Sequence, residues 1–333
     1  MTWRRDACWA PMCATGGAGV WAGLAVLARA GICRMGGIEL LFLFAPLVIV
    51  PLGMALGRVM EFSSSSRPVR EPSSTAVIDW FLARLQPVAA ATAVMALLLP
   101  PGHAAGGLAC TWLFFCLFIA VCAAAGSISA TASGRIPLLW EWALLIAKID
   151  LLVGGAWFLA SRLGIRPSGM PEPVGLLTAV HFHFAGFATA MIAAAAGQFA
   201  ASRAERRGLR FLIPVVVAMP FVVAIGFVTL PALKTGAALL LAISVAGLAV
   251  CLRSLARAMT RRTSRVLLQI APASVFVGMV LAGAYAIADF VGSDRLSMPQ
   301  MVRTHGVLNG MGFCLPGLLG WLVETERAAE RPR

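Results

Sequence analysis

The chain has 333 residues, of which 60% are hydrophobic and only 12% are charged, and its mean hydropathy is +0.87. This composition excludes soluble globular folds, because so few charged side chains could not cover a water-facing surface, whereas a lipid-facing surface needs none. The net charge of +13 does not indicate a nucleic-acid partner, because the arginines lie in short groups between apolar segments, as membrane topology signals do. We therefore predict an all-α, polytopic transmembrane helix bundle surrounded by membrane lipids.

Ten segments are long and apolar enough to cross a bilayer, which needs about 20 residues per span. The first is the weakest, since it is rich in Gly and Ala and carries Arg29, so an interfacial helix and a total of nine spans is the alternative. No stretch is long and polar enough for a separate soluble domain, so residues 1–333 are expected to form a single transmembrane domain. The predicted spans are 12–32, 37–59, 82–101, 105–131, 137–163, 174–201, 208–230, 236–257, 265–291 and 301–323.

The basic residues predict how these spans are oriented. With ten spans and the N-terminus inside, nineteen of the 27 Lys and Arg residues lie in inner segments, seven lie in outer segments, and Lys148 lies within a span. This asymmetry predicts a cytoplasmic C-terminus whether or not the first segment crosses the membrane. The Ala-, Gly- and Arg-rich composition favours a bacterial protein of the inner (cytoplasmic) membrane.

Ionisable side chains within the spans are few, and each costs about 2.5 to 3.5 kcal/mol on insertion scales unless it has a partner. The orientation places all four histidines, Glu39 and Asp289 in the outer half of the membrane, which suggests a functional layer there. Lys148 and Asp150 are two residues apart and point to different helix faces, so a bridge from Lys148 to an acidic residue of another helix is the structural alternative. The candidate catalytic residues are Glu39, Asp150, His181, His183, Asp289, His305 and Asn309.

Helix geometry constrains the histidines further. His181 and His183 point about 200° apart in a regular helix, so only one of them can face a small ligand unless Gly186 loosens the turn and lets both converge. His305 and Asn309 are four residues apart and share one face, which is flanked by glycines that permit close helix approach or leave room for a substrate.

Three stretches resemble the YndJ-like family of bacterial integral membrane proteins. They are GGIELLFLFAPLVIVPLG at 36–53, VHFHFAGF at 180–187 and RTHGVLNGMGF at 303–313. The resemblance would cover most of the chain, and it implies a multi-helix membrane fold without specifying a reaction. It also marks a set of polar positions as typical of the family: Glu39, His181, His183, His305 and Asn309.

The leading functional hypothesis is an intramembrane enzyme without a cofactor that acts on an apolar small molecule from the bilayer. Histidine can give or take a proton near neutral pH, and a carboxyl group in an apolar pocket can stay protonated and act as an acid. Glu39, Asp150 or Asp289 would supply the acid, a histidine would supply the base, and Asn309 would hold a substrate oxygen. Compatible reactions are the cyclisation, isomerisation or ring opening of an isoprenoid- or polyketide-like substrate, as in natural product biosynthesis.

Three alternatives stay open at this point. A transition metal could be bound by His181, His183, His305 and Glu39, or haem by His183 and His305, although HExxH and ExxH spacings are absent from the sequence. A proton-coupled transporter would use the prolines within the spans as hinges, although no internal repeat is visible. In the last alternative, the histidines only satisfy helix contacts in a structural or partner-binding protein.

Overall fold

The structure is a computed structural model that describes residues 9–64, 74–293 and 295–330, and this part of the chain contains helices and no strands. The first half comprises α2 (Trp9–Arg29), α3 (Gly37–Phe44), η1 (Ala45–Ile49), α4 (Val50–Ser64), α5 (Ser74–Leu98), α6 (His103–Ala132) and α7 (Leu139–Leu163). The second half comprises η2 (Pro167–Gly169), α8 (Val174–His181), η3 (Phe182–Ala188), α9 (Thr189–Phe199), α10 (Arg203–Val228), α11 (Pro231–Ala258), α12 (Arg262–Phe290), α13 (Met298–Met301), η4 (Val302–Gly306), η5 (Leu308–Cys314) and α14 (Leu315–Glu330).

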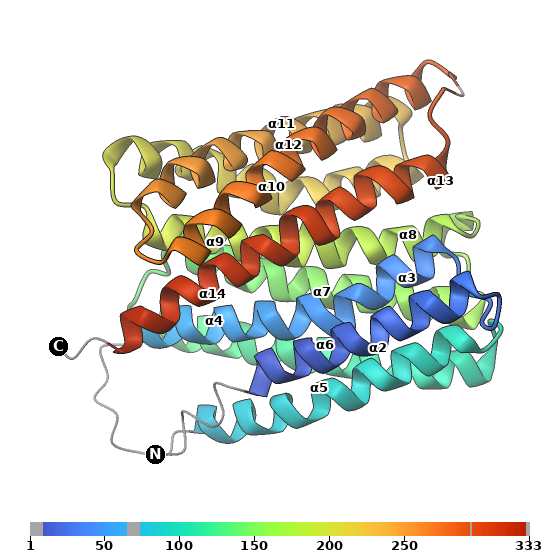
Figure 1. The fold of residues 1–333 in the computed structure, drawn as a ribbon, viewed down its shortest axis with the longest axis horizontal. Coiled ribbons are helices and arrows are strands. Elements are labelled where there is room, and N and C mark those ends of the chain that lie inside the picture. Colours follow the sequence, from blue (N-terminus) through green and yellow to red (C-terminus); the bar gives the residue numbers. More distant parts are fainter. Residues whose placement is uncertain (1–8, 65–73, 294, 331–333) are drawn as a thin grey trace.

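Ten helical segments of the described chain are long and apolar enough to cross a membrane, which confirms the all-α bundle. The helices lie alongside one another, and the two ends of the chain lie at the same end of the bundle (Figure 1). The central segments are α3–η1–α4 and α8–η3–α9, which are buried along most of their length because other helices surround them. Helix α11 packs against α10 and α12 on one side of the bundle, and α6 packs against α5 and α7 on the other (Figure 1).

Helix α2 runs along the second span instead of lying across the end of the bundle (Figure 1). The indole Nε1 of Trp21 donates to the carbonyl of Leu40 at 2.7 Å, and Gly17 lies against the backbone of Leu47, with no space for a side chain. The close approach requires glycine at this position. This packing along the second span favours ten spans over the nine that an interfacial first helix would leave.

Three of the spans contain π-helical turns, which are wider than α-helical turns and leave some backbone carbonyls without an intrahelical partner. In the second span, the carbonyl of Pro46 would pair with residue 51 in π geometry, but Pro51 has no N–H to donate. The side chain of Gln86 on α5 supplies the missing donor, with Nε2 2.7 Å from the Pro46 oxygen. A side chain from a neighbouring helix therefore stabilises the irregular turn η1.

Replacing Gln86 by Met is expected to lower the free energy of unfolding by about 1 to 3 kcal/mol, because the buried carbonyl of Pro46 then has no donor. The change would appear as a lower unfolding temperature of the detergent-purified protein. Thr92→Val on the same helix is the matched control, since its hydroxyl bonds only to the local carbonyl of Ala89. Equal unfolding temperatures for the two variants would contradict this role of Gln86.

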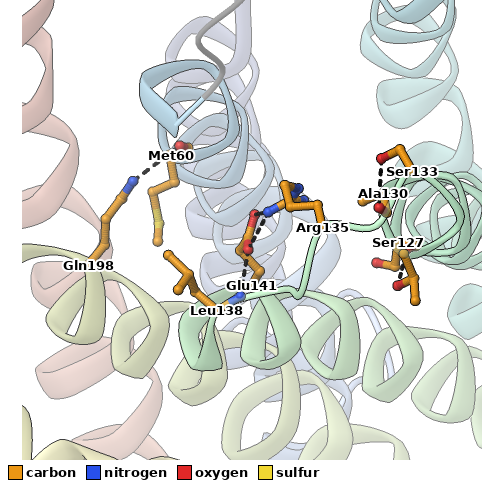
Figure 2. A network of polar contacts seen from close by, with 9 residues as sticks. Met60, Ser127, Ala130, Ser133, Arg135, Leu138, Glu141 and Gln198 are labelled. Atoms are coloured by element: carbon orange, nitrogen blue, oxygen red, sulfur yellow. Dashed lines mark hydrogen bonds and ion pairs between the residues drawn. The ribbon is translucent and has the colours of Figure 1, made fainter.

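Polar contacts tie the helices together at the end of the bundle that holds the two chain ends. Arg135 forms an ion pair with Glu141 at 2.7 Å, and Glu141 also accepts the backbone N–H of Leu138 at the start of α7 (Figure 2). Nearby, Nε2 of Gln198 on α9 donates to the carbonyl of Met60 on α4 (Figure 2).

Lys148 forms a salt bridge to an acidic residue of another helix, which was the structural alternative to a functional role. Its Nζ lies 2.5 Å from Oε1 of Glu61, so the bridge joins α7 to α4. The arginines at the start of α10, at the end of α11 and at the start of α12 lie at this same end of the bundle.

Candidate functional site

A cavity of about 490 Å³ lies between α8–η3, the three helices α10, α11 and α12, and the last span. The lining segments of α8, α12 and α13 lie at the end of the bundle opposite the two chain ends (Figure 1). Most of the lining is aliphatic or aromatic, so the cavity is better suited to an apolar molecule than to water. The polar and ionisable lining residues are Thr178, His181, Thr189, Lys234, Thr235, Tyr285, Asp289, His305 and Asn309.

His305 and Asn309 form one hydrogen-bonded unit in this wall. Nδ1 of His305 lies 2.8 Å from the carbonyl of Gly278, which can only accept, so Nδ1 carries the proton. Nε2 then accepts from Nδ2 of Asn309 at 2.9 Å. The ring is thus held in one tautomer, while Oδ1 of Asn309 is buried and has no hydrogen-bond partner in the described structure. The predicted shared face of these two residues is present.

The glycines of the last span let neighbouring helices approach this unit closely. A methyl group added at Gly306 would lie 2.7 Å from Cδ2 of Leu41, and one at Gly310 would lie 3.1 Å from the ring of Phe184. Gly312 leaves no space for a side chain against Ser274. The glycines therefore bring the polar unit close to α3, η3 and α12, as the sequence led us to expect.

His181 is the second ionisable group of the cavity wall at this level. It ends α8 and lines the same cavity as His305. Its Nε2 is buried without a hydrogen-bond partner among the described residues. Unlike His183 and His305, His181 thus has a ring nitrogen that is not already used by the described part of the protein.

His183 faces away from the cavity and into the core. Trp112 Nε1 donates to its Nε2 at 3.1 Å, so Nδ1 carries the proton and donates to the carbonyl of Ala179 at 2.7 Å. The ring also packs against Phe42 and the indole of Trp112. The two histidines of this span therefore diverge, as a regular helix predicts, even though a π-helical turn does form at Phe182–Ala188.

Asp150 is fully buried on α7, and η3 lies between it and the cavity. Both of its carboxyl oxygens lack a hydrogen-bond partner in the described structure. Its Cβ and Cγ would each lie 2.7 Å from a methyl group added at Gly186, so the two helices touch at this point. Asp150 therefore does not line the cavity with His181 and His305, although the sequence grouped them.

Glu39 and Asp289 have partners within the protein. Glu39 does not line the cavity, and its Oε2 accepts the backbone N–H of Gly36 at 3.0 Å, so it caps the start of α3. Asp289 does line the cavity, where its Oδ2 forms a 2.5 Å ion pair with Nζ of Lys234. This partly exposed pair lies close to the first turn of α11 and the last turn of α12, which places it at the mouth of the cavity, away from the two chain ends.

Five polar lining residues were not among the candidates from the sequence: Thr178, Thr189, Lys234, Thr235 and Tyr285. Lys234 looked like an ordinary loop residue at the outer side, because its partner Asp289 lies 55 residues further along the chain. Lys234, Thr235 and Tyr285 lie three to four residues from other lining positions on α11 and α12. This spacing is the only sign in the sequence that they line the cavity, and it becomes informative once the lining face is known.

The four residues proposed for a metal do not come together. In the described segments of the chain, no three His, Cys, Asp or Glu side chains lie near enough to one another to hold a metal ion. A haem held by His183 and His305 would require both rings to lose the hydrogen bonds described above.

Comparison with known proteins agrees with this fold. A curated relative, the uncharacterized membrane protein YndJ of Bacillus subtilis (strain 168), is 27% identical over 284 residues, which are 84% of this chain and 49% of the relative. The chain therefore spans about half the length of that relative. No solved structure matches it. The model of the YndJ-like protein family matches residues 40–313, which include η3, η4 and all but the last residue of η5, so the chain belongs to the YndJ-like family of membrane proteins.

Proposed function

We propose that the chain is an integral membrane enzyme that uses acid–base chemistry on an apolar small molecule held in the cavity. The observation that carries this proposal is that two residues lining an apolar cavity each have a buried polar atom without a hydrogen-bond partner in the described structure. His181 Nε2 and Asn309 Oδ1 are both buried and have no hydrogen-bond partner within the described part of the chain, and both residues line the cavity. Native structures rarely leave buried polar groups unpaired, and such groups often belong to a functional site.

In this proposal, His181 is the group that takes and returns a proton. A single base can move a proton between two positions of one substrate, as an isomerisation requires, and apolar walls limit the exchange of that proton with water. The His305–Asn309 unit orients a substrate oxygen, because Asn309 keeps one amide N–H beyond the one that it donates to His305. Cyclisation and ring opening of an isoprenoid- or polyketide-like compound are compatible with the same groups.

The π-helical turns support this assignment. Such turns are rare and are found frequently at functional sites, and here η3, η4 and η5 all contribute residues to the cavity wall. At η3 the carbonyl of Phe184 accepts both the backbone N–H of Thr189 and its hydroxyl, the latter at 2.9 Å. Side-chain contacts thus hold the irregular backbone beside the cavity.

We also propose the inner membrane of a bacterium, with the C-terminus in the cytoplasm. The arginine-rich end of the bundle then lies at the cytoplasmic face, and the cavity mouth at Lys234 and Asp289 lies in the outer half of the bilayer. The exposed aliphatic side chains along α11 and α12 contact lipid, so an apolar substrate can reach the cavity from the bilayer.

The experiment compares two histidine variants of the detergent-purified protein on a total lipid extract from the producing bacterium. His181→Phe is expected to lower conversion of the substrate by about 10²- to 10⁴-fold with an unchanged unfolding temperature, because it removes the proton-transfer group. His183→Phe is the matched control, in which the unfolding temperature falls and the turnover per folded molecule persists. Untargeted mass spectrometry reads the conversion, and equal product profiles for the wild type and His181→Phe would contradict the proposal.

A further inference from the structure

The lining residues follow α11 and α12 for several turns, which makes the cavity long and narrow. On α11 the lining extends from Lys234 to Val245, about 16 Å along the helix axis at 1.5 Å per residue. On α12 the carbonyl of Gly278, which accepts from His305, lies about 16 Å from Asp289 by the same measure. The histidine layer and the Lys234–Asp289 ion pair are therefore about 16 Å apart, which is roughly the length of an extended hydrocarbon chain. The cavity lining between them is mostly apolar.

The polar groups at the outer mouth favour an anion. The ammonium group of Lys234 has three N–H donors, of which one serves Asp289, and it also lies 5.0 Å from the ring centre of Phe227. The neighbouring residue Thr235 lines the cavity, and its hydroxyl is buried and has no hydrogen-bond partner in the described structure. Tyr285, one turn before Asp289, adds a second hydroxyl to this end of the lining.

The charged residues around the mouth of the cavity also favour an anion. Arg295 lies in the connection between α12 and α13, and Arg303 lies on η4 beside the lining residue Val302. Two other carboxylates of this end in the described structure accept backbone N–H groups: Glu39 at the start of α3 and Glu172 at the start of α8. Asp294, the neighbour of Arg295, lies outside the described residues. Among the described lining residues, one acidic residue, Asp289, and one lysine, Lys234, are present, and Arg303 lies nearby.

We infer that the cavity binds a single-chain amphiphile whose anionic headgroup lies at Lys234 and Thr235 and whose apolar chain extends inward along α11 and α12 to His181 and His305. This inference rests on the proposed function for the identity of the site and adds the substrate class. It also places the reacting part of the substrate within the chain, because the headgroup lies about 16 Å from the histidine layer along α12.

The test uses a hexadecanoic acid that carries a photoreactive diazirine in its chain, bound to the full-length protein in liposomes. Crosslinks are expected on the lining faces of α11 and α12. Unlabelled hexadecanoate and hexadecyl phosphate are expected to compete about tenfold better than hexadecanol or hexadecyltrimethylammonium, because charge-assisted hydrogen bonds to Lys234 form only with an anion. Octanoate is expected to compete more weakly than hexadecanoate, since its chain ends short of the histidine layer.

Three variants separate an effect on headgroup binding from an effect on folding. Lys234→Gln is expected to abolish the tenfold preference for anionic competitors, and Lys234→Arg is expected to retain it. Arg166→Gln removes a positive charge at the same end without touching the lining and should behave as the wild type. If the competitors compete equally well whatever their headgroup, this inference is wrong and the proposed function stands. If no alkyl compound competes with the probe, the use of the cavity as a substrate site is wrong as well.

Discussion

Replacing Gly186 by alanine is expected to lower the free energy of unfolding by about 3 kcal/mol or more, at the upper end of what overpacking costs in a well-packed core. The added methyl group would lie 2.7 Å from both Cβ and Cγ of Asp150. Cβ cannot rotate away from the contact because it is fixed to the backbone, so η3 and α7 would have to separate. Thermal unfolding of the detergent-purified protein measures the loss.

Two further variants make this prediction specific. Gly107→Ala on α6 is the matched control, because nothing lies within 4 Å of a methyl group added there, and alanine is the better helix former. Asp150→Gly in the Gly186→Ala background removes the opposing Cβ and is expected to restore part of the lost stability. A Gly186→Ala variant as stable as the wild type would contradict the close contact between α7 and η3.

Hydropathy was sufficient to predict the number of spans and their approximate positions, because the bilayer imposes a minimum length and an apolar surface on every span. The helix ends extend beyond several predicted boundaries. For example, the fourth span was predicted to begin at residue 105 and α6 begins at His103, because a helix continues into the interfacial region where charge and hydropathy no longer mark it.

The π-helical turns could not be predicted from hydropathy. Proline is the local signal in the second span, but the turn at Ala45–Ile49 also depends on Gln86, which belongs to another helix. The turn at Phe182–Ala188 contains no proline and rests on the hydroxyl of Thr189. Both therefore depend on side-chain partners that the sequence does not identify.

The candidate site could be predicted only in part. Periodicity indicated that His181 and His183 diverge and that His305 and Asn309 meet, and both expectations match the geometry. Which of the divergent histidines faces the cavity depends on Trp112, which lies 71 residues away from His183 in the sequence. Asp150 was a candidate because it is an ionisable residue within a span, but this position alone does not show that η3 lies between it and the cavity.

Filling the cavity is expected to weaken ligand binding strongly with little loss of stability. Ala282 lies on the lining face of α12, between Asp289 at the mouth and the level of His305. An indole at this position would occupy the space that the apolar chain needs, so Ala282→Trp is expected to weaken binding by about 100-fold, which corresponds to about 2.7 kcal/mol. Ala91→Trp on an exposed position of α5 is the matched control.

The most direct test of the central claim, that this cavity holds the substrate, is native mass spectrometry of the protein after incubation with lipid extract. We expect the wild type and Ala91→Trp to retain the same small apolar molecule and Ala282→Trp to retain none, with all three unfolding at similar temperatures. Equal retention by Ala282→Trp would contradict the account, because the molecule would then be bound somewhere other than the cavity between α8, α12 and the last span.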